Sequence, residues 1–401
     1  MSDSSTAAPG KLRVLLALPD LQDLGVQHDV RALLHHWDRE RFTPALLVHK
    51  REGAFADQFP PTQETIEVDK LIPDVRGARI LLRVLGYARA FRQFRPHAVI
   101  SFVPYSNLAA LYARPISGVR FGLAVSEHAH VTASMRDPEA FYGAFLWFYR
   151  RRFSALYNQR ADKVKCIAEE SRRDLIEHHG VRAEQTCLIY NPVEIDEVQK
   201  LALEPATHPW FESEETARVP LIVNVGRLSW QKRQDLLLTA FARLRAKRPV
   251  RLALVGRGPW LQRLEHQAAQ LGISDDVVFL GFQRNPWRFL ARASLFALSS
   301  DWEGLPCVLT EAMCLRKPVV STRCPSGPAE MLLDGDGGLL VPCGDADALA
   351  AAMQDVLTRP EAARARVETA YAALGRFRPE TVTPQYQALA EEIARRVGAW
   401  P

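Results

Sequence analysis

The chain has 401 residues, 47% of them hydrophobic, and a formal charge of +5 at pH 7. This length exceeds one ordinary hydrophobic core and predicts two domains, and the hydrophobic content suits buried sheets. No run of about 18 apolar residues occurs, which argues against a membrane-spanning helix, and the six scattered cysteines lack CxxC pairs, which indicates reduced thiols in a cytosolic protein.

The positive charge is concentrated in one segment of the chain. Between Leu71 and Arg173 there are 17 Lys and Arg residues against 7 Asp and Glu. Clustered cations of this kind point to phosphates or to an anionic membrane surface. Nucleic acid is the competing partner, but the sequence has no zinc-finger spacing and no RNP-type motif, so we expect no nucleic acid.

The N-terminal half begins like a Rossmann-like domain. Residues 1–10 are small and polar, have no apolar signal core and are expected to be disordered. A hydrophobic strand at 11–18 is followed by a loop through Gly25, a helix with apolar positions at helical spacing, and a second strand at 45–48. This β-loop-α-β order is typical of such domains, and we assign residues 11–200 to the first domain.

Two further strands in this half lead to polar side chains. The strand at 97–102 is followed by Asn107, which either contacts a ligand or caps the next helix. The strand at 121–126 ends at Glu127 and His128. Ligands bind at the carboxyl edge of parallel strands, so a titratable pair there is a candidate site. Glu127 could serve only to orient the imidazole.

Residues 140–157 combine eight aromatic side chains with the three arginines Arg150, Arg151 and Arg152. Aromatic residues beside arginines suit a lipid headgroup interface. The alternative is a core helix whose polar face carries the arginines. We favour membrane contact, because a basic helix at 80–94 belongs to the same half.

Residues 201–219 are charged and contain proline, and we interpret them as a linker to a second domain at 220–378. The first strand of that domain leads into a loop with Gly226, Arg227 and Lys232. Gly226 permits a sharp turn. Arg227 and Lys232 can bind one diphosphate, the first as a planar fork and the second as a point charge.

Gly256 and Gly258 form a lone Gly-x-Gly. The complete GxGxxG fingerprint is absent, so we reject a dehydrogenase. Further on, Phe282 ends the strand at 277–282 and either holds a nucleotide base or packs as an ordinary aromatic residue.

Two glutamates, Glu303 and Glu311, are separated by seven residues. A buried strand at 295–298 precedes them, and helical spacing begins after Pro306, which places Glu303 in a strand-to-helix loop and Glu311 in the helix. A helix N-terminus presents N–H groups to an anion, and carboxylates accept hydrogen bonds from sugar hydroxyls. The pattern predicts a phosphate flanked by polyol-binding carboxylates.

Together these motifs resemble the retaining GT-B glycosyltransferases of family four, also called glycosyl transferases group 1. The resembling segments are Glu127-His128, Asn191-Pro192, the Gly226 to Lys232 loop, the Glu303 to Glu311 stretch and Gly327-Pro328-Ala329-Glu330. The last of these is typical of members that build lipid-linked bacterial glycans. The first loop departs from the family, because Val26 and His28 replace a glycine and a glutamate.

The resemblance implies an α/β fold of two Rossmann-like domains with parallel sheets facing a central cleft, and a C-terminal helix at 379–401 that crosses back to the first domain. It implies retaining, metal-independent transfer of a hexose or N-acetylhexosamine from a nucleotide sugar, with UDP preferred and no cofactor. The acceptor would be lipid-linked or a glycan, and the protein would be cytoplasmic and peripheral on the inner face of the membrane.

The resemblance also implies roles for single residues. Those implied to be catalytic are His128, Arg227, Lys232 and Glu303. Those implied to bind substrate are Gly25, Asn107, Glu127, Gly226, Phe282, Gly304, Leu305, Pro306 and Glu311. Two other interpretations remain: a GT-B nucleotide-sugar epimerase, and an inactive nucleotide-sugar-binding partner suggested by Val26 and His28.

Overall fold

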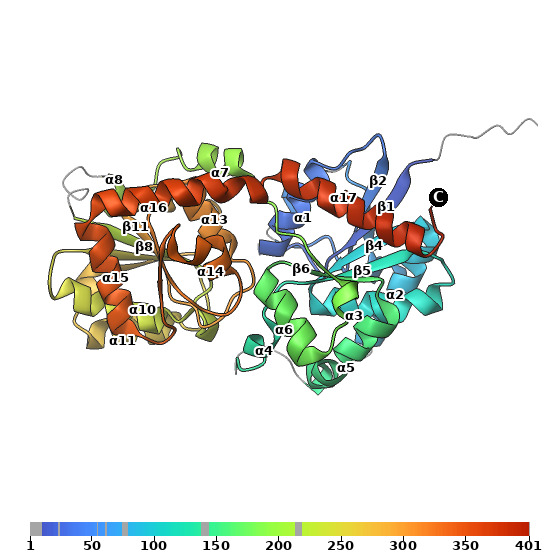
Figure 1. Ribbon diagram of the computed structural model, residues 1–401, viewed down its shortest axis with the longest axis horizontal. Coiled ribbons are helices and arrows are strands. Elements are labelled where there is room, and N and C mark those ends of the chain that lie inside the picture. The colour runs from blue at the N-terminus through green and yellow to red at the C-terminus, as the bar shows by residue number, and fades with distance from the viewer. Residues whose placement is uncertain are drawn as a thin grey trace, which may run out of the picture.

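The structure is a computed structural model. It describes residues 10–22, 25–53, 55–60, 62–73, 79–137, 144–212 and 219–400, without the side chains of 79–80 and 144–151. The elements form two α/β domains side by side (Figure 1). Residues 1–9 of the segment predicted to be disordered lie outside the described part of the chain.

The N-terminal domain is built on a seven-stranded parallel sheet in the order β3-β2-β1-β4-β5-β6-β7. Its strands are β1 (Leu12–Ala17), β2 (Phe42–Val48), β3 (Thr65–Glu67), β4 (Ala98–Phe102), β5 (Gly122–Glu127), β6 (Lys163–Cys166) and β7 (Thr186–Leu188). Alternate residues of a strand enter opposite hydrophobic layers, as with Leu15 and Leu16 of β1. Both faces are therefore covered, which explains the continuous hydrophobic runs of the central strands.

Helices cover both faces of this sheet. The layer that contains Leu15 includes side chains of α2 and α3, and the layer that contains Leu16 includes side chains of α1. The elements are α1 (Gly25–His35), η1 (Ala56–Gln58), η2 (Val68–Leu71), α2 (Arg79–Phe94), α3 (Val103–Ser117), α4 (Val131–Ser134), α5 (Ala144–Arg160), α6 (Glu169–His179) and η3 (Ala183–Gln185).

The C-terminal domain contains a six-stranded parallel sheet in the order β10-β9-β8-β11-β12-β13. Its strands are β8 (Leu221–Val225), β9 (Arg251–Val255), β10 (Val277–Gly281), β11 (Leu295–Leu298), β12 (Val319–Thr322) and β13 (Leu339–Val341). In both sheets the strand order reverses beside the first strand of the domain, between β1 and β4 and between β8 and β11. Such switch points are where open α/β sheets bind ligands.

The helical elements of this half are α7 (Ile195–Leu201), α8 (Pro209–Glu212), η4 (Trp230–Lys232), α10 (Gln234–Arg245), α11 (Leu261–Gln270), η5 (Ser274–Asp276), α12 (Trp287–Leu290), α13 (Cys307–Cys314), α14 (Gly327–Met331), η6 (Leu333–Gly335), α15 (Ala346–Thr358), α16 (Pro360–Ala372) and η7 (Ala373–Phe377). The segment 201–219 therefore contains a short helix, α8, where the sequence predicted only a linker.

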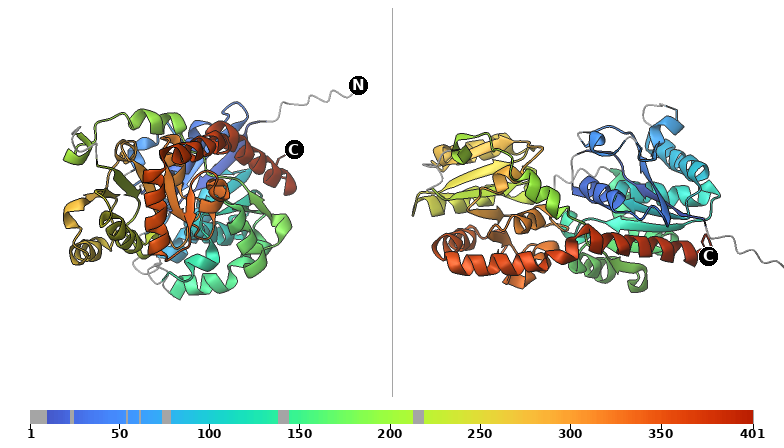
Figure 2. Two further views of the ribbon diagram at one scale, coloured as in Figure 1. Left: turned by 60° about the vertical axis from the view of Figure 1, so that its left-hand side comes forward. Right: turned by 90° about the horizontal axis from the view of Figure 1, so that it is seen from above.

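The last helix, α17 (Pro379–Arg396), leaves the C-terminal domain and lies along the N-terminal domain (Figures 1 and 2). At the crossing, the Val193 N–H donates to the Phe377 carbonyl at 2.8 Å. Tyr386 and Ile393 are fully buried in the hydrophobic layer that also holds α1. Gly122 allows this packing, because a Cβ there would lie 2.2 Å from the Ile393 carbonyl oxygen.

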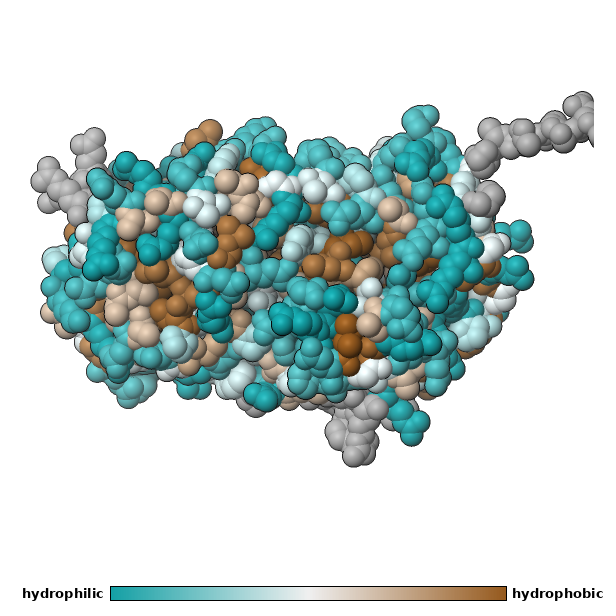
Figure 3. Space-filling model, viewed as in Figure 1, coloured by the Kyte–Doolittle hydropathy of each residue, from teal (hydrophilic) through white to brown (hydrophobic). Residues whose placement is uncertain are grey.

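Hydrophilic residues dominate the surface in Figure 3, with hydrophobic residues gathered in small patches. Among the helices that the structure describes, none is long and apolar enough to cross a membrane. The predicted fold class, with two parallel Rossmann-like domains, is confirmed.

Candidate functional site

The candidate site centres on two loops at the carboxyl edge of the C-terminal sheet. Lys232 ends η4 after β8, and Glu303 lies between β11 and α13. Lys232 Nζ lies 2.6 Å from Glu303 Oε1, and the Ser300 hydroxyl donates to the same oxygen at 2.6 Å. The side chains of Lys232 and Glu303 are only 18% and 5% exposed. Buried charges need partners, so this pairing holds both groups in one geometry.

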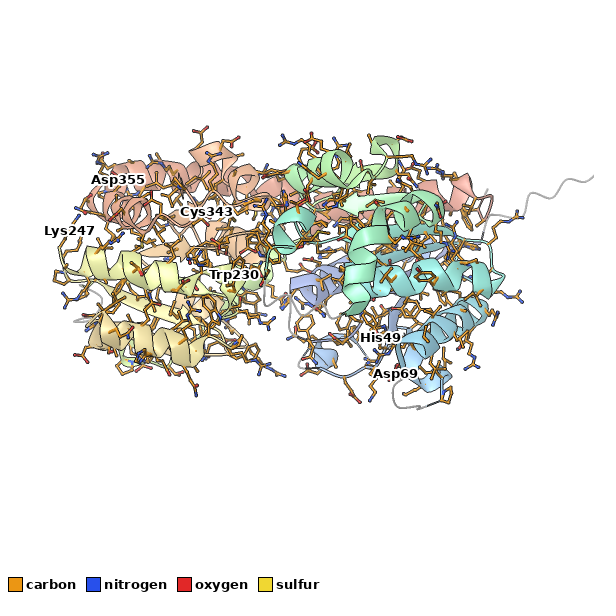
Figure 4. All side chains as sticks on the ribbon, turned by 90° about the horizontal axis from the view of Figure 1, so that it is seen from below. His49, Asp69, Trp230, Lys247, Cys343 and Asp355 are labelled. Atoms are coloured by element: carbon orange, nitrogen blue, oxygen red, sulfur yellow. The ribbon has the colours of Figure 1, made fainter. Side chains whose placement is uncertain are left out.

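Neighbouring residues fasten the two loops together. The Asp301 N–H donates to the Gln231 carbonyl at 2.9 Å, and Gln231 Nε2 donates to the Trp302 carbonyl at 3.0 Å. Arg233 adopts a left-handed φ of 48° and binds Asp301 at 2.8 Å. Figure 4 shows Trp230, at the start of η4, on the side of this domain that faces the N-terminal domain. The loop that carries Lys232 is therefore fixed by contacts to the loop that carries Glu303.

Arg227 lies on the same loop and is exposed. Within the described parts of the chain, its guanidinium forms no ion pair.

Gly226, which was expected to permit a sharp turn, does not have a left-handed φ, and a Cβ there would meet only Lys232 at 3.8 Å. The close approach instead requires Gly256, whose φ is 143° and whose Cβ would lie 2.0 Å from the Gly226 carbonyl oxygen. The lone Gly-x-Gly thus serves packing of this loop.

The loop from Gly304 to Pro306 joins Glu303 to α13. A Cβ on Gly304 would lie 2.1 Å from the His128 carbonyl oxygen, so this glycine allows the two domains to touch. Leu305 is buried in the hydrophobic core of the C-terminal domain, and Pro306 immediately precedes α13. Gly304 and Leu305 therefore shape the site through packing.

The first turn of α13 faces the start of α1. A Cβ on Gly25 would lie 3.3 Å from Cys307 Sγ, so the first loop of the N-terminal domain reaches this turn. The turn contains no acidic residue. Its N–H groups and the positive end of the helix dipole suit an anion. Glu311 lies one turn further along the helix and is partly exposed.

His128 lies at the end of β5, where its Nε2 is 2.8 Å from Ser126 Oγ. Desolvation by the surrounding protein, with the charge of Lys165 adding to it, holds the pKa of His128 well below its ordinary value. The His130 N–H donates to the Glu303 carbonyl at 3.3 Å. His128 is therefore a neutral imidazole near neutral pH, and its segment contacts the loop that carries Glu303.

Glu127 and Asn107 lie behind this surface. Glu127 is 3% exposed and accepts hydrogen bonds from Asn107 Nδ2 at 3.3 Å and from the Tyr157 hydroxyl. Asn107 is fully buried and lies inside α3, which begins at Val103. Of the two alternatives for Asn107, the helix cap is wrong, because α3 starts one turn earlier. The two side chains are hydrogen-bonded to each other, and Asn107 Nδ2 also donates to the Ser126 carbonyl near the end of β5.

The altered first loop has a structural explanation. Val26 lies in the first turn of α1 and packs against the hydrophobic layer of the N-terminal domain. The His28 ring lies 4.2 Å from the Phe55 ring, measured between centroids. Both side chains thus contact the N-terminal domain, which accounts for residues other than glycine and glutamate at these positions.

Two buried ionisable groups, Asp29 and Lys165, were not predicted from the sequence. Asp29 in α1 is 1% exposed and lies 4.0 Å from Cys307 Sγ, whereas Lys165 in β6 is fully buried with Nζ 3.2 Å from Asn191 Oδ1. Burial raises the pKa of Asp29 to about 8, and burial lowers the pKa of Lys165 to about 8. Their positions in a helix and a strand predict only core packing, so no signal in the sequence marked them.

Phe282 follows β10 and is 39% exposed. The Arg257 guanidinium lies 5.0 Å from the centroid of its ring. The Phe282 ring is therefore partly exposed near the carboxyl end of β10, and Arg257 lies over it as a cation–π partner.

Only part of the predicted aromatic and basic segment is described. Phe153 and Tyr157 of α5 are buried in the core, in line with the core-helix alternative. Arg152 is exposed. Phe141 and Tyr142 lie outside the described residues, and the side chains of 144–151, Arg150 and Arg151 among them, are not described.

Two parallel Rossmann-like domains that touch through their carboxyl edges, with a final helix crossing between them, define the GT-B class of protein. The family model for Glycosyltransferase Family 4 matches residues 25–197, and the model for Glycosyl transferases group 1 matches residues 210–373. The chain belongs to this family of GT-B glycosyltransferases, and the resemblance inferred from its motifs is confirmed.

Among similar proteins, an uncharacterized glycosyltransferase of Methanocaldococcus jannaschii is 29% identical over 266 residues, which are 63% of this chain and 62% of that protein. A Campylobacter jejuni protein, N-acetylgalactosamine-N,N'-diacetylbacillosaminyl-diphospho-undecaprenol 4-alpha-N-acetylgalactosaminyltransferase, is 26% identical over 67% of this chain and 69% of its own. The chain thus spans less than two thirds of the first relative.

Solved structures show the same fold. The Anabaena protein HepE, crystallised with UDP-glucose, superimposes with a TM-score of 0.77 at 21% identity, over 95% of this chain and all of that chain.

Proposed function

We propose that the protein is a retaining hexosyltransferase that moves a hexose or N-acetylhexosamine from a nucleotide sugar, UDP-linked in preference, to a lipid-linked or glycan acceptor. The observation that carries the proposal is the Lys232–Glu303 pair at 2.6 Å beside the start of α13, with the exposed Arg227 on the same loop. Two cations and a helix N-terminus suit a diphosphate, and carboxylates suit sugar hydroxyls.

In the reaction, the bond between the anomeric carbon and the diphosphate oxygen breaks, and the acceptor oxygen forms a bond to that carbon on the same face. The acceptor hydroxyl loses its proton to the departing phosphate. Arg227, Lys232 and the first-turn N–H groups of α13 stabilise the charge that develops on the diphosphate. These groups supply the positive charge, so the proposed mechanism needs no metal and no cofactor.

The remaining roles follow from placement. Glu303 accepts hydrogen bonds from the transferred sugar, Glu311 from the ribose, and Phe282 stacks on the base. His128 is neutral near neutral pH because burial holds down its pKa, so it offers both a donor and an acceptor to the sugar. Asn107 and Glu127 support the β5 end from behind and touch no substrate.

The acceptor assignment rests on the relatives. The printed name of the C. jejuni relative describes sugar addition to an undecaprenol diphosphate. We extend this to the present chain as assembly of a bacterial surface polysaccharide or glycan at the cytoplasmic face of the membrane. The protein would be peripheral there, would bind the anionic surface reversibly, and would bind no nucleic acid.

Mass spectrometry of products tests the proposal. The chain is incubated with a panel of nucleotide sugars and with lipid-diphosphate or glycan acceptors, and a product one sugar heavier is expected. Lys232→Ala should lower turnover about ten- to a hundredfold, the effect of losing one charge-assisted contact of about 1.5–3 kcal/mol. Lys247→Ala is the control, since Lys247 lies on the outer side of the C-terminal domain (Figure 4).

Three outcomes would contradict the proposal. Interconversion of the nucleotide sugar without an acceptor would indicate an epimerase. Tight nucleotide binding without turnover on any acceptor would indicate an inactive binding partner. Equal turnover of Lys232→Ala and wild type would overturn the diphosphate assignment.

A further inference from the structure

Two helix starts from different domains cap each other. The Glu169 N–H, at the start of α6 in the N-terminal domain, donates to Glu330 Oε2 of α14 at 2.8 Å. In return, the Ser326 N–H, just before α14 in the C-terminal domain, donates to Glu170 Oε2 of α6 at 2.8 Å. Each helix start thus obtains its carboxylate from the other domain, where the helix dipole favours negative charge.

Hydroxyl groups strengthen this contact. The Tyr190 hydroxyl donates to Glu330 Oε1 at 2.5 Å. The hydroxyl oxygens of Ser171 and Ser326 lie 2.6 Å apart, and both residues are 1% exposed. These hydrogen bonds give the contact a defined geometry, and breaking the buried Ser171–Ser326 bond leaves its hydroxyl groups without that partner.

Ser326 has an unusual backbone. Its φ is 87° and its ψ is −136°, a strained region that residues other than glycine rarely adopt. The N–H and the hydroxyl of Ser326 itself are bonded to Glu170 and Ser171, which both belong to the N-terminal domain. Docking of the two domains therefore supplies the hydrogen-bond partners of the N–H and hydroxyl of Ser326.

The segment around Ser326 also holds the loop that carries Glu303. The Glu303 N–H donates to the Pro325 carbonyl at 3.3 Å, and the Gly327 N–H donates to the Gly304 carbonyl at 2.8 Å. The contact is close, because a Cβ on Gly327 would lie 2.5 Å from the Gly304 oxygen. A shift at Ser326 must therefore move its neighbours Pro325 and Gly327, and with them the backbone of Glu303 and Gly304.

We propose that Glu170 and Glu330 are positioning residues, which couple docking of the N-terminal domain to the placement of Glu303. When the domains are docked, the reciprocal caps fix Ser326, and residues 325–327 fix the Glu303 loop. When the domains separate, Ser326 relaxes and the loop loses these supports. The role of Glu303 toward the sugar rests on the proposed function, whereas the mechanical coupling does not.

The coupling should affect the binding of a nucleotide sugar more than the binding of a nucleoside diphosphate. A nucleoside diphosphate such as UDP would bind through Lys232, Arg227 and α13, all in one domain. A nucleotide sugar also needs Glu303, whose position depends on the other domain. Sugar binding would thus require domain docking.

A cavity of about 570 Å³ beside the caps, lined by residues of both domains, leaves this edge of the boundary open to solvent.

Hydrogen exchange of the full chain, without any ligand, tests the coupling independently of transfer activity. Glu170→Ala and Glu330→Ala should each speed exchange of peptides covering 303–306 and 324–328 about tenfold or more, since each loses a charge-assisted hydrogen bond. Glu177→Ala is the matched control, because Glu177 is exposed on the same helix. Glu170→Gln, which keeps an acceptor oxygen, should fall between wild type and Glu170→Ala.

Calorimetry with UDP and with UDP-glucose, each on the full chain, adds the functional readout. Glu170→Ala should weaken UDP-glucose binding more than UDP binding, because only the sugar needs the Glu303 carboxylate, whereas Lys232 and α13, which adjoin the same loop, bind the diphosphate of both ligands. Unchanged exchange at 303–306 in both alanine variants would overturn the coupling, whatever sugar the protein transfers. Changed exchange without transfer activity in wild type would instead contradict only the proposed function.

Discussion

His49 closes β2 in a buried polar cluster at the carboxyl edge of the N-terminal sheet, with Asp69 beside it (Figure 4). Its Nε2 lies 3.3 Å from the Tyr87 hydroxyl, and its ring packs edge-on against Tyr105 at 5.1 Å. Burial and, to a smaller extent, the charge of Arg83 lower the pKa of His49 to about 3, and Asp69 opposes both. The folded protein therefore holds a neutral imidazole here.

This predicts a pH dependence of stability. The unfolded chain protonates His49 below about pH 6.5, whereas the folded chain does so only near pH 3. The unfolded state binds more protons between these values, so stability is fully present above about pH 6.5 and falls as the pH decreases. Between these pH values, His49 lowers the free energy of unfolding by up to about 1.4 kcal/mol for each unit by which the pH falls.

Unfolding midpoints measured from pH 7 to pH 5 check this prediction. His49→Gln should flatten the dependence, and His266→Gln, at an exposed position of α11, should keep the wild-type slope. A wild-type slope in His49→Gln would show that other groups carry the acid sensitivity.

At the scale of elements, α17 belongs structurally to the N-terminal domain although it follows the C-terminal domain in sequence. Tyr386 stacks on Phe102 with ring centroids 6.2 Å apart, and Lys165 Nζ lies 5.1 Å from its centroid. The Tyr386 hydroxyl is buried and has no hydrogen-bond partner among the residues that the structure describes. The ring therefore contributes packing, whereas its hydroxyl contributes none of the hydrogen bonding that a buried polar group needs.

The two parts of this side chain should be separable. Tyr386→Ala removes a fully buried aromatic ring and should destabilise the N-terminal domain by about 3–5 kcal/mol. Tyr386→Phe removes only the unpaired hydroxyl and should leave stability unchanged or raised. Denaturant unfolding, monitored by the susceptibility of each domain to proteolysis, compares the stability of the two variants with that of wild type. A large loss in Tyr386→Phe would mean that the hydroxyl has a partner after all.

At the scale of the whole molecule, the charge excess lies in the half that we propose faces the membrane. In α2, Arg89 and Arg92 donate to backbone carbonyls, which do not neutralise their charge. Leu81 and Leu85 on the same helix are 76% and 43% exposed. Exposed leucines beside arginines on one helix suit insertion into an anionic headgroup layer.

Cosedimentation with phosphatidylglycerol vesicles tests this surface. We expect binding at low salt that weakens as salt screens the attraction, and little binding to neutral vesicles. Replacing Leu81 and Leu85 by serine should weaken binding about tenfold or more, because the leucines bury apolar area in the membrane. The control is Leu271→Ser, at a 38% exposed position in the other domain. If the wild-type protein does not bind anionic vesicles at low salt, a water-soluble acceptor becomes the better interpretation.

The sequence by itself determined the two parallel sheets and the loops that carry Lys232 and Glu303. Strand and helix periods, glycine turns and carboxyl-edge positions are local properties, so they can be read along the chain. Their mutual distance is not local, and only the folded sheet brings Lys232 within 2.6 Å of Glu303.

The tertiary structure alone decided what depends on contacts between distant segments. It turned Glu127 and Asn107 inward, and it showed that Gly304 is small because the His128 carbonyl approaches it. It also placed Glu330 against Glu169, 161 residues away in sequence. Such roles depend on which surfaces meet when two domains dock, and neither residue type nor spacing along one segment encodes that meeting.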